Sequence, residues 1–413
     1  MRDVAVIGAG MTHFGKFLDR SMKDLAREAV EGALQSAGLD KSKLNVAVVG
    51  NATAGLITGQ EMIRGQVALR DMGIGGIPII NTENACASSS TAFHVAWTYV
   101  ASGMYDVALA VGMEKLYHED KTRSFKAIGA AVDVEWVAQM QAAAAAKKEA
   151  EAANGQDNPD VAEGAGEKRS MFMDFYAAFA RHHMEKYGTT KEQFARVAVK
   201  NHFHGSLNPH AQYREVYTLE DVLTSPPVAE PLTRLMCSPI GDGAAATVLV
   251  SPEIARQMGS KPVWVKASVL NSGFDRQPGE DDVTTVTAKK AYEMASVGPE
   301  DLNVLEVHDA SAPAELVLYE ELGLCAPGEG GALIDSKATY FDGPKAVNPS
   351  GGLISKGHPI GATGVAQIYE IFTQLRGEAG DRQVKDPKVG LTENGGGMVK
   401  GDPAAVAVHI LAV

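Results

Sequence analysis

Short apolar runs alternate along the chain with longer segments in which apolar residues recur every three or four positions. The run VAVIGAG at 4–10 predicts a buried strand that ends in a glycine turn, and MKDLAREAVEGALQSA at 22–37 has the spacing of an amphipathic helix. The same reasoning predicts strands at 45–49, 77–80 and 106–111 and a helix at 87–102. This alternation is typical of a layered α/β fold.

The order of these elements repeats in the second half of the chain. AKKAYEMASVG followed by LNVLEVH, within 288–308, echoes EAVEGALQSAG followed by LNVAVVG, within 28–50. The helix expected after GHPIGATG echoes the helix expected after ACASSS. We therefore predict two similar α/β halves packed together, with Cys86 and His358 at equivalent helix starts.

The segment between the two halves has a different composition. The stretch at 142–169 is rich in Ala and Glu and poor in aromatic residues, which predicts an exposed helix with a flexible part. MFMDFYAAFARHHMEKYG at 171–188 predicts an amphipathic helix. We interpret this segment as an insertion over the active-site face, and a lid and a plain surface excursion both remain open. The predicted division is a first part of the N-terminal half at 1–115, an insertion at 116–230, the last strands of that half at 231–255 and a C-terminal half at 256–413.

Composition and charge exclude several classes of protein. The chain has 413 residues, more than one ordinary core holds, which agrees with two fused halves. A net charge of −13 argues against nucleic-acid binding, and an anionic substrate would need a local basic patch. No apolar run is long enough to span a membrane, and no secretory signal is visible. Three cysteines do not make a disulfide framework, so we expect a reducing cytoplasm.

The most informative segment for chemistry is NPSGGLISKGHPIGATGVAQ at 348–367. Glycines on both sides of His358 let a ligand approach the backbone closely, and the helix start that follows points unpaired N–H groups at the same place. These features suit a reactive group beside a polarised oxygen, although a tight turn alone would also explain them.

Cys86 in NACASSS is the predicted partner of this histidine. A thiol at a helix start has a lowered pKa, because the helix dipole favours the thiolate. His308 ends a predicted strand at the sheet edge where α/β sites lie. One cysteine with two histidines suits covalent acyl transfer, in which one imidazole activates the thiol and the other donates to an oxygen. We interpret Cys237 and Cys325 as packing or loop residues, and the remaining histidines, such as the pair at 182–183, as solvated. No metal-ligand spacing is visible.

These motifs resemble those of the thiolases, most closely the sterol-carrier-protein-type branch. The resemblance covers nearly the whole chain and is carried by ACASSS at 85–90, SPIGDGAAA at 238–246, VHDAS at 307–311, NPSGGLISKGHPIGATG at 348–364 and ENGGG at 393–397. It implies a duplicated five-layered α-β-α-β-α core of two five-stranded sheets, with a loop domain inserted in the N-terminal half. It also implies coenzyme A as substrate or product with no tightly bound cofactor, and a homodimer or tetramer.

The resemblance assigns a role to each matching residue. Cys86 would take the acyl group, His358 would activate it, and His308 would help to bind the thioester oxygen. Ser238 would contact the pantetheine arm of coenzyme A. Gly396 would offer a backbone N–H near the acyl oxygen, opposite the N–H of Cys86. For the coenzyme A phosphates, the candidate cations are Lys115, Arg123 and Lys126.

The chain departs from the thiolase pattern at the second catalytic cysteine. In thiolases this residue moves the proton of the α-carbon, but here Glu393 and Asn394 occupy one of its two known positions and Ala310 occupies the other. A histidine or Glu393 could take over the role, or the chemistry could differ, since decarboxylating ketosynthases use a similar Cys-His-His set without this base.

Three functions remain open at this stage. The first is a thiolase-like acyltransferase of lipid metabolism that acts on acyl-CoA, by 3-ketoacyl-CoA thiolysis or acetoacetyl-CoA formation. The second is a thiolase-fold aldolase or acyltransferase that works with a small zinc-ribbon/OB-fold partner. The third is a non-catalytic acyl-CoA or lipid-binding protein, which the retention of Cys86, His308 and His358 disfavours.

Overall fold

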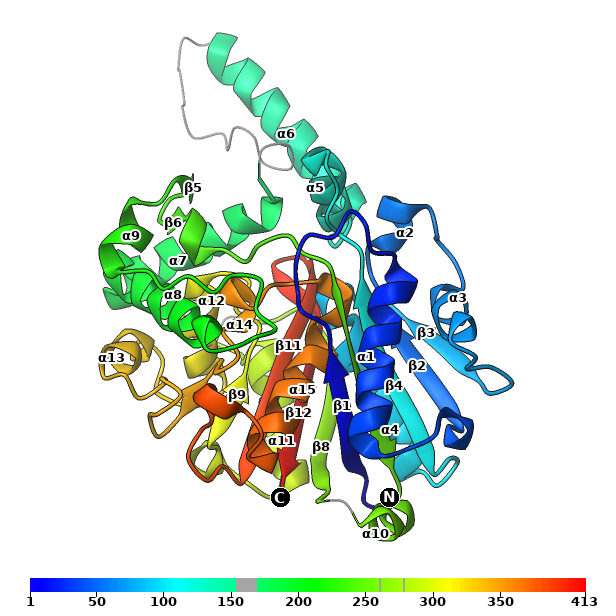
Figure 1. Cartoon of the computed structure of the whole chain (residues 1–413). Helices are drawn as coiled ribbons and strands as arrows, with labels where there is room; N and C mark the ends of the chain where they lie inside the picture. Colours follow the sequence, from blue (N-terminus) through cyan, green and yellow to red (C-terminus); the bar gives the residue numbers. More distant parts are fainter. Residues whose placement is uncertain (154–168, 260, 278) are drawn as a thin grey trace.

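The computed structural model describes residues 1–153, 169–259, 261–277 and 279–413, and its centre is one large mixed sheet (Figure 1). The sheet has ten strands in the order β10-β9-β11-β12-β8-β1-β7-β4-β2-β3. The strands of the first half are β1 (Ala5–Met11), β2 (Val46–Gly50), β3 (Ile79–Thr82), β4 (Val107–Glu114) and β7 (Gly243–Val250). Those of the second half are β8 (Val263–Ser272), β9 (Val304–Glu306), β10 (Ala346–Val347), β11 (Val389–Val399) and β12 (Asp402–Ala412).

The two halves have the same internal topology. Numbered in chain order within each half, the strands lie in the order 3-2-4-5-1 from the outer edge to the middle of the sheet. The first strands of the halves, β1 and β8, meet in the middle through the antiparallel pairs Ala5↔Trp264 and Val6↔Val263. The predicted repeat is therefore present. The two five-stranded sheets join into one, because the innermost strands of the two halves, β1 and β8, pair with each other along their edges.

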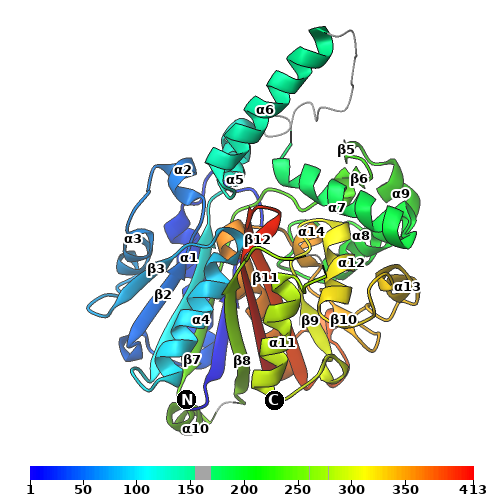
Figure 2. The ribbon, with the colours of Figure 1, turned by 180° about the vertical axis from the view of Figure 1, so that it is seen from behind.

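The helices complete five layers. Buried apolar residues of α1 (Met22–Ala37) pack on one face of the first half of the sheet. The helices α4 (Ser88–Ala101) and α15 (Thr363–Arg376) share the central core with strands of both halves. In the second half, α11 (Val283–Ala295) and α12 (Ala312–Glu321) pack on the opposite outer face, and Figure 2 shows α11 across these strands. The predicted helix at 22–37 is confirmed, and its start is fixed by a capping box between Ser21 and Asp24.

The central helices approach each other closely at their starts. A Cβ atom on Gly364 would lie 2.0 Å from the Ser90 hydroxyl oxygen, so only glycine allows this contact. The backbone N–H of Val365 donates to Ser89 Oγ over 3.1 Å. This contact holds together the two helix starts that follow Cys86 and His358.

The segment between β4 and β7 forms a separate group of helices above the sheet. It contains α5 (Lys121–Gly129), α6 (Val134–Ala153), α7 (Met171–Tyr187), α8 (Lys191–Ser206), α9 (Leu219–Thr224), β5 (Pro227–Ala229) and β6 (Leu232–Thr233). In both views α6 projects away from the body, as Figures 1 and 2 show. The predicted helices are confirmed, whereas the predicted flexible part falls largely on 154–168, outside the described residues.

Shorter helices complete the described structure: α2 (Ala54–Thr58), α3 (Arg64–Asp71), α10 (Pro252–Met258), α13 (Gly330–Asp335) and α14 (Gly352–Ser355). None of the helices within the described ranges is long and apolar enough to cross a membrane.

Candidate active site

The Cys86 thiol stands on a strained turn between β3 and α4. The 3-10 turn Ala85–Ala87 precedes the helix, and Ala85 has a φ of 47°, in the left-handed region that residues with a side chain rarely adopt. The Ala85 N–H donates to Glu83 Oε1 over 2.6 Å, which helps to hold this conformation. The strain is concentrated beside the proposed nucleophile, as is common at functional sites.

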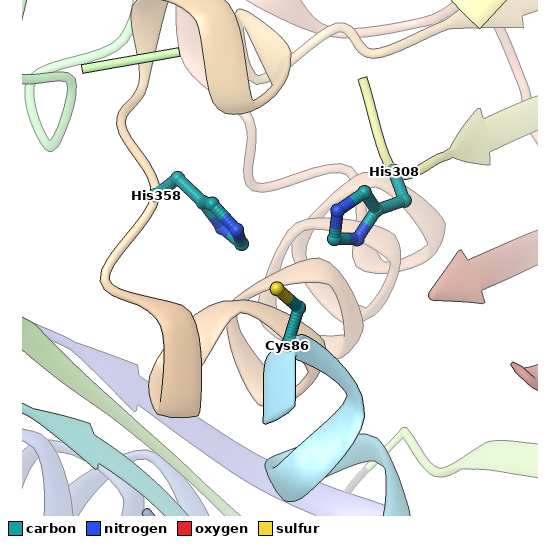
Figure 3. A group of neighbouring side chains, drawn as sticks. All are labelled: Cys86, His308 and His358. Atoms are coloured by element: carbon teal, nitrogen blue, oxygen red, sulfur yellow. The ribbon is translucent and has the colours of Figure 1, made fainter. Parts of the chain in front are cut away.

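The structure brings Cys86, His308 and His358 together (Figure 3). The thiol sulfur and one ring nitrogen of each histidine all lie within 4.8 Å of one another. The two imidazole rings are nearly perpendicular, with centroids 5.1 Å apart. His308 follows β9, and His358 lies two residues before the 3-10 turn that leads into α15. The nucleophile and one histidine therefore come from corresponding strand-to-helix connections of the two halves, but the position that matches Cys86 is Gly361, three residues after His358.

A short hydrogen bond sets the proton position on His358. Its Nδ1 lies 2.7 Å from Thr363 Oγ1, and the hydroxyl of Thr363 donates to the carbonyl of Pro359 over 3.2 Å. Since that hydroxyl proton is already used, Thr363 accepts from Nδ1–H of His358. The other nitrogen, Nε2, then carries a lone pair, which is what a general base needs.

His308 is held in the opposite state. The Ser90 hydroxyl donates to Asn394 Oδ1 over 2.8 Å, which leaves the amide N–H₂ to face His308 Nδ1 at 2.9 Å. Because Nδ1 accepts this hydrogen bond, the ring proton lies on Nε2. His308 is therefore a donor for an oxygen, while His358 is an acceptor for a proton. Asn394 thus fixes the orientation and tautomer of the His308 ring.

Replacing Asn394 by alanine should separate these two roles. Without the amide, nothing selects the donor form of His308, and loss of an oriented donor to a developing oxyanion costs about 10²- to 10³-fold in rate. We expect kcat for acyl transfer to fall by that factor while the rate of Cys86 alkylation by iodoacetamide stays near wild type, because His358 is untouched. A parallel loss of alkylation would contradict the assignment, and Ser90→Ala should reproduce a weaker form of the same pattern.

Burial dominates the pKa values in this group. It raises the pKa of the Cys86 thiol to about 12, with smaller contributions from Glu114 and Glu83, and backbone N–H groups only partly oppose it. It lowers the pKa of His308 to about 4 and that of His358 well below its ordinary value. The prediction of a lowered thiol pKa is therefore wrong for the free protein, since desolvation outweighs the helix start. The resting pair is a neutral thiol and a neutral imidazole.

The ENGGG turn packs against the loop that carries the thiol. A Cβ on Gly396 would lie 2.1 Å from the carbonyl oxygen of Asn84, so this glycine lets the turn pack directly on the nucleophile's loop. The backbone N–H that hydrogen-bonds to the Cys86 sulfur, and lowers its pKa, belongs to Gly397. Gly397 has a φ of 65°, which also favours glycine.

Glu393 lies where a second catalytic cysteine is missing. Its side chain is almost fully buried, lines the same cavity as Cys86, and accepts a hydrogen bond from the backbone N–H of His308 at Oε2 over 3.0 Å. No residue within the described ranges donates to its Oε1. Burial raises the pKa of this carboxyl to about 7, and the bond from His308 limits the rise. Ala310, at the alternative position, offers no titratable group.

A cavity of about 610 Å³ connects these residues to the surface. Ser238 lines it, and its backbone N–H donates to the carbonyl of Ala310 over 3.0 Å. The predicted phosphate-binding cations do not line it. Lys115 is buried and pairs with Asp242 at 2.8 Å, and Arg123 is held against His118 at 2.9 Å. The basic residues that do line the cavity include Lys16, Lys121 and Arg234.

Several histidines predicted to be solvated are buried. His182 is exposed as predicted, but His183 lies in the interior, with Nδ1 2.8 Å from Thr189 Oγ1 and Nε2 3.2 Å from Glu320. His202, His204 and His409 are also buried. The prediction fails because the partners come from distant segments. Cys325 is a partly buried loop residue, as predicted, whereas Cys237 also lines the cavity.

Two sequence profiles match the chain: the thiolase N-terminal domain over residues 4–253 and the thiolase C-terminal domain-like profile over 278–410. This chain belongs to the thiolase family. The thiolase relatives include an acetyl-CoA acetyltransferase from Methanothermobacter thermautotrophicus, 41% identical over 99% of both chains. Sterol carrier protein 2 from Oryctolagus cuniculus is 36% identical over 95% of this chain and 69% of that protein. Both the fold class and the family predicted from the motifs are confirmed.

Solved thiolase-fold structures cover the whole chain. An Ltp2-ChsH2(DUF35) aldolase matches with a TM-score of 0.75 at 26% identity, over all of this chain and 98% of that one. Human mitochondrial 3-ketoacyl-CoA thiolase matches with a TM-score of 0.69 at 16% identity over the same shares, which supports the fold alone. Within this thiolase, sequence reasoning missed Thr363, Ser90 and Gly397, because each acts on a catalytic residue through a contact that local spacing does not reveal.

Proposed function

We propose that this thiolase is an acyltransferase that acts on acyl-CoA thioesters through an acyl group carried on Cys86. The observation that carries the proposal is the thiol placed between two histidines of opposite tautomer, one with a free lone pair and one with a free N–H. The kinship with an acetyl-CoA acetyltransferase supports the same chemistry. Retention of both tautomers disfavours a non-catalytic binding protein.

In the first half-reaction, Nε2 of His358 takes the thiol proton as the sulfur attacks the thioester carbonyl. A new carbon–sulfur bond forms to Cys86, and the bond to the coenzyme A sulfur breaks. The leaving thiolate receives the proton from His358. The backbone N–H groups of Cys86 and Gly397 face the sulfur and would stabilise the oxygen of the tetrahedral intermediate.

In the second half-reaction, a carbon nucleophile or coenzyme A attacks the acyl group. For carbon–carbon bond formation, Glu393 would remove the α-proton of a second acyl-CoA, and Nε2–H of His308 would hold the enolate oxygen. The enolate carbon then attacks the acyl carbonyl, and the Cys86 sulfur leaves as a thiolate. The α-proton that Glu393 removed passes to this thiolate, which restores both the thiol and the carboxylate. Thiolysis follows the same steps in reverse, with Glu393 as the acid.

The carboxyl of Glu393 gives opposite pH dependence in the two directions. Its pKa is raised to about 7 by burial, so the ionised form needed for condensation increases as the pH rises through 7. The protonated form needed for thiolysis decreases over the same range. Glu393→Gln should lower the condensation and thiolysis rates by about 10²- to 10⁴-fold, as expected for loss of a general acid–base group. It should also remove the pH dependence near pH 7 in both directions.

Two measurements make this test specific. Transfer of the acetyl group to Cys86, followed by intact mass, should stay near wild type in Glu393→Gln, because that step needs no α-proton. Exchange of acetyl-CoA methyl protons in D₂O, followed by NMR, should stop. The exposed Glu253, far from the site on α10, provides Glu253→Gln as the matched control. Unchanged thiolysis in Glu393→Gln would exclude Glu393 as the acid–base residue.

A second candidate is a thiolase-fold aldolase or acyltransferase that works with a small zinc-ribbon/OB-fold partner. The similar Ltp2-ChsH2(DUF35) aldolase, whose name pairs two components, favours it. Purification of the native protein at low salt would distinguish the two: a stoichiometric small partner supports the complex, and a homodimer or tetramer with full thiolysis activity supports the stand-alone enzyme.

We also propose a cytoplasmic location and the four-part division of the chain. All three cysteines are free, as a reducing compartment favours. The helices α5 to α9 fall within 116–230, which supports a loop domain inserted in the first half.

A further inference from the structure

The inserted segment reaches the catalytic histidines through one face of α8. Asn201 and Gly205, one helical turn apart, lie on this face and are buried. The helix packs beside α12 and α14, as Figures 1 and 2 show. A Cβ atom on Gly351, which precedes α14, would lie 2.6 Å from the Cα atom of Gly205, so the two backbones are in direct contact. The insertion is therefore anchored against the segment that leads to His358.

Asp309 joins the two segments that carry the catalytic histidines. It follows His308 directly, and its side chain is fully buried. Its Oδ1 accepts a hydrogen bond from the backbone N–H of Leu353 over 2.6 Å, and its Oδ2 accepts one from the backbone N–H of Ile354 over 3.3 Å. Both N–H groups belong to α14, and Ile354 lies four residues before His358. This carboxyl group therefore couples the position of one imidazole to the position of the other.

Asn201 holds this carboxyl group from α8. Its Nδ2 lies 2.7 Å from Asp309 Oδ2 and 2.6 Å from Glu315 Oε2, so both amide protons are donated to carboxyl oxygens. The amide cannot be reversed, because its oxygen would then face two carboxyl oxygens. As placed, Oδ1 of Asn201 is buried and has no hydrogen-bond partner among the described residues. An unpaired buried acceptor lowers stability, so this arrangement favours the position of Asp309 at a cost to the fold.

Asp309 depends on Asn201 more than Glu315 does. The carboxyl group of Glu315 has three further side-chain partners, which are Tyr319 Oη at 2.5 Å, Asn348 Nδ2 at 2.7 Å and Lys200 Nζ at 2.5 Å. Among the described residues, Asn201 is the one side chain that donates to Asp309, whose other two donors are the backbone N–H groups of α14. Loss of the amide would therefore act mainly on Asp309.

We propose that Asn201 is a positioning residue for acyl transfer. It acts through Asp309, which sets the spacing between His308 and His358. The inference rests on the proposed acyl-transfer function and adds a role for the inserted segment, which supports the site and does not open as a lid at α8. Precise spacing matters because a displacement of catalytic groups by about 1 Å can cost about 10²-fold in rate.

The test compares two rates in Asn201→Ala protein. For thiolysis of acetoacetyl-CoA, kcat should fall by about 10²-fold, as expected for misplaced catalytic groups. KM should stay near wild type, since Asn201 does not line the cavity. Alkylation of Cys86 by iodoacetamide should slow by at least about tenfold, because part of the general-base contribution of His358 is lost. This second effect distinguishes the variant from Asn394→Ala, in which alkylation stays near wild type.

A purely structural role would give a different result. Gln193→Ala is the matched control, because Gln193 lies eight residues earlier on the same helix and donates to the carboxyl group of Asp335 over 2.8 Å. Gln193 also belongs to the capping box of α8, so its loss should lower Tm. Both rates should stay at the wild-type level when measured well below Tm. If Asn201→Ala also lowers Tm and leaves both rates unchanged, the proposal is overturned.

A double-mutant cycle shows whether Asn201 acts through Asp309. Asp309→Asn keeps the shape of the side chain but turns an amide N–H₂ toward N–H donors, so it should slow both reactions by itself. Adding Asn201→Ala should then cause little further loss, whereas independent effects would multiply to within about twofold and contradict the proposal. Asn201→Ser, which keeps one hydroxyl donor, should restore part of both rates, and it tests the same role if Asn201→Ala does not fold.

These experiments also separate the two proposals. If wild-type protein transfers no acyl group but Asn201→Ala still slows alkylation of Cys86, the proposed transferase function fails and the positioning of His358 remains. If wild-type protein transfers the acyl group and Asn201→Ala changes neither rate, the positioning role fails and the transferase function remains.

Discussion

Replacement of Cys86 by alanine is expected to abolish acyl transfer and the mass adduct that acetyl-CoA leaves on the protein. The sulfur is the only group in the cluster that can form the thioester, so the rate should fall by at least about 10⁴-fold. Intact-mass spectrometry after brief incubation with acetyl-CoA measures the adduct directly. Wild-type protein should gain one acetyl group and Cys86→Ala none.

Cys237→Ala is the matched control for this experiment. Cys237 also lines the cavity, but its thiol donates to the carbonyl of Thr233 over 3.4 Å, and burial raises its pKa to about 12. The variant should keep both adduct and activity. A mass adduct on Cys86→Ala protein, or the absence of any adduct on wild-type protein, would rule out the thiolase mechanism.

Replacement of His358 by alanine should give the second largest loss. The thiol has a pKa of about 12, so almost no thiolate exists at neutral pH unless a base accepts the proton during attack. Removing that base should slow acyl transfer by about 10²- to 10⁴-fold. Alkylation of Cys86 by iodoacetamide should slow as well, and its rate in the variant should increase with pH up to about 12, as free thiolate accumulates.

Thr363→Val provides the graded control for His358. It retains the imidazole but removes the acceptor that holds the proton on Nδ1, so both rates should lie between those of wild type and His358→Ala. A wild-type alkylation rate in His358→Ala would show that another group, with His308 nearest, accepts the thiol proton.

Local patterns were sufficient to predict much of the fold. The helix at 22–37 has the predicted bounds, because its apolar spacing and its cap both lie within the segment. The strand before His308 is shorter than predicted and ends at Glu306, since the N–H of Val307 donates to the side chain of Asn348 instead of to a neighbouring strand. A side chain 41 residues away therefore ends a strand that its own sequence would continue.

The reacting groups of the site could be predicted from the sequence, but their pKa shifts and their hydrogen-bond and ion-pair partners could not. Motif order was enough to choose Cys86, His308 and His358, but the sign of the thiol pKa shift depends on how much protein covers the sulfur. The same limit explains Lys115, whose charge reads as available in the sequence but is paired with Asp242, 127 residues later. Spacing along the chain reports which groups are present, whereas desolvation and distant partners decide what they do.

The two halves share one topology, which raises the question of why they are fused in a single chain instead of forming a dimer of identical subunits. A pseudo-twofold axis between α4 and α15 would relate the turn of Cys86 to the turn before α15, so a dimer of identical halves would carry the same residues in both turns. Two thiols or two imidazoles could not share one proton in the way a thiol and an imidazole do. Covalent fusion lets the two halves acquire different residues, so that a thiol from one half and an imidazole from the other can act as proton donor and proton acceptor in one active site.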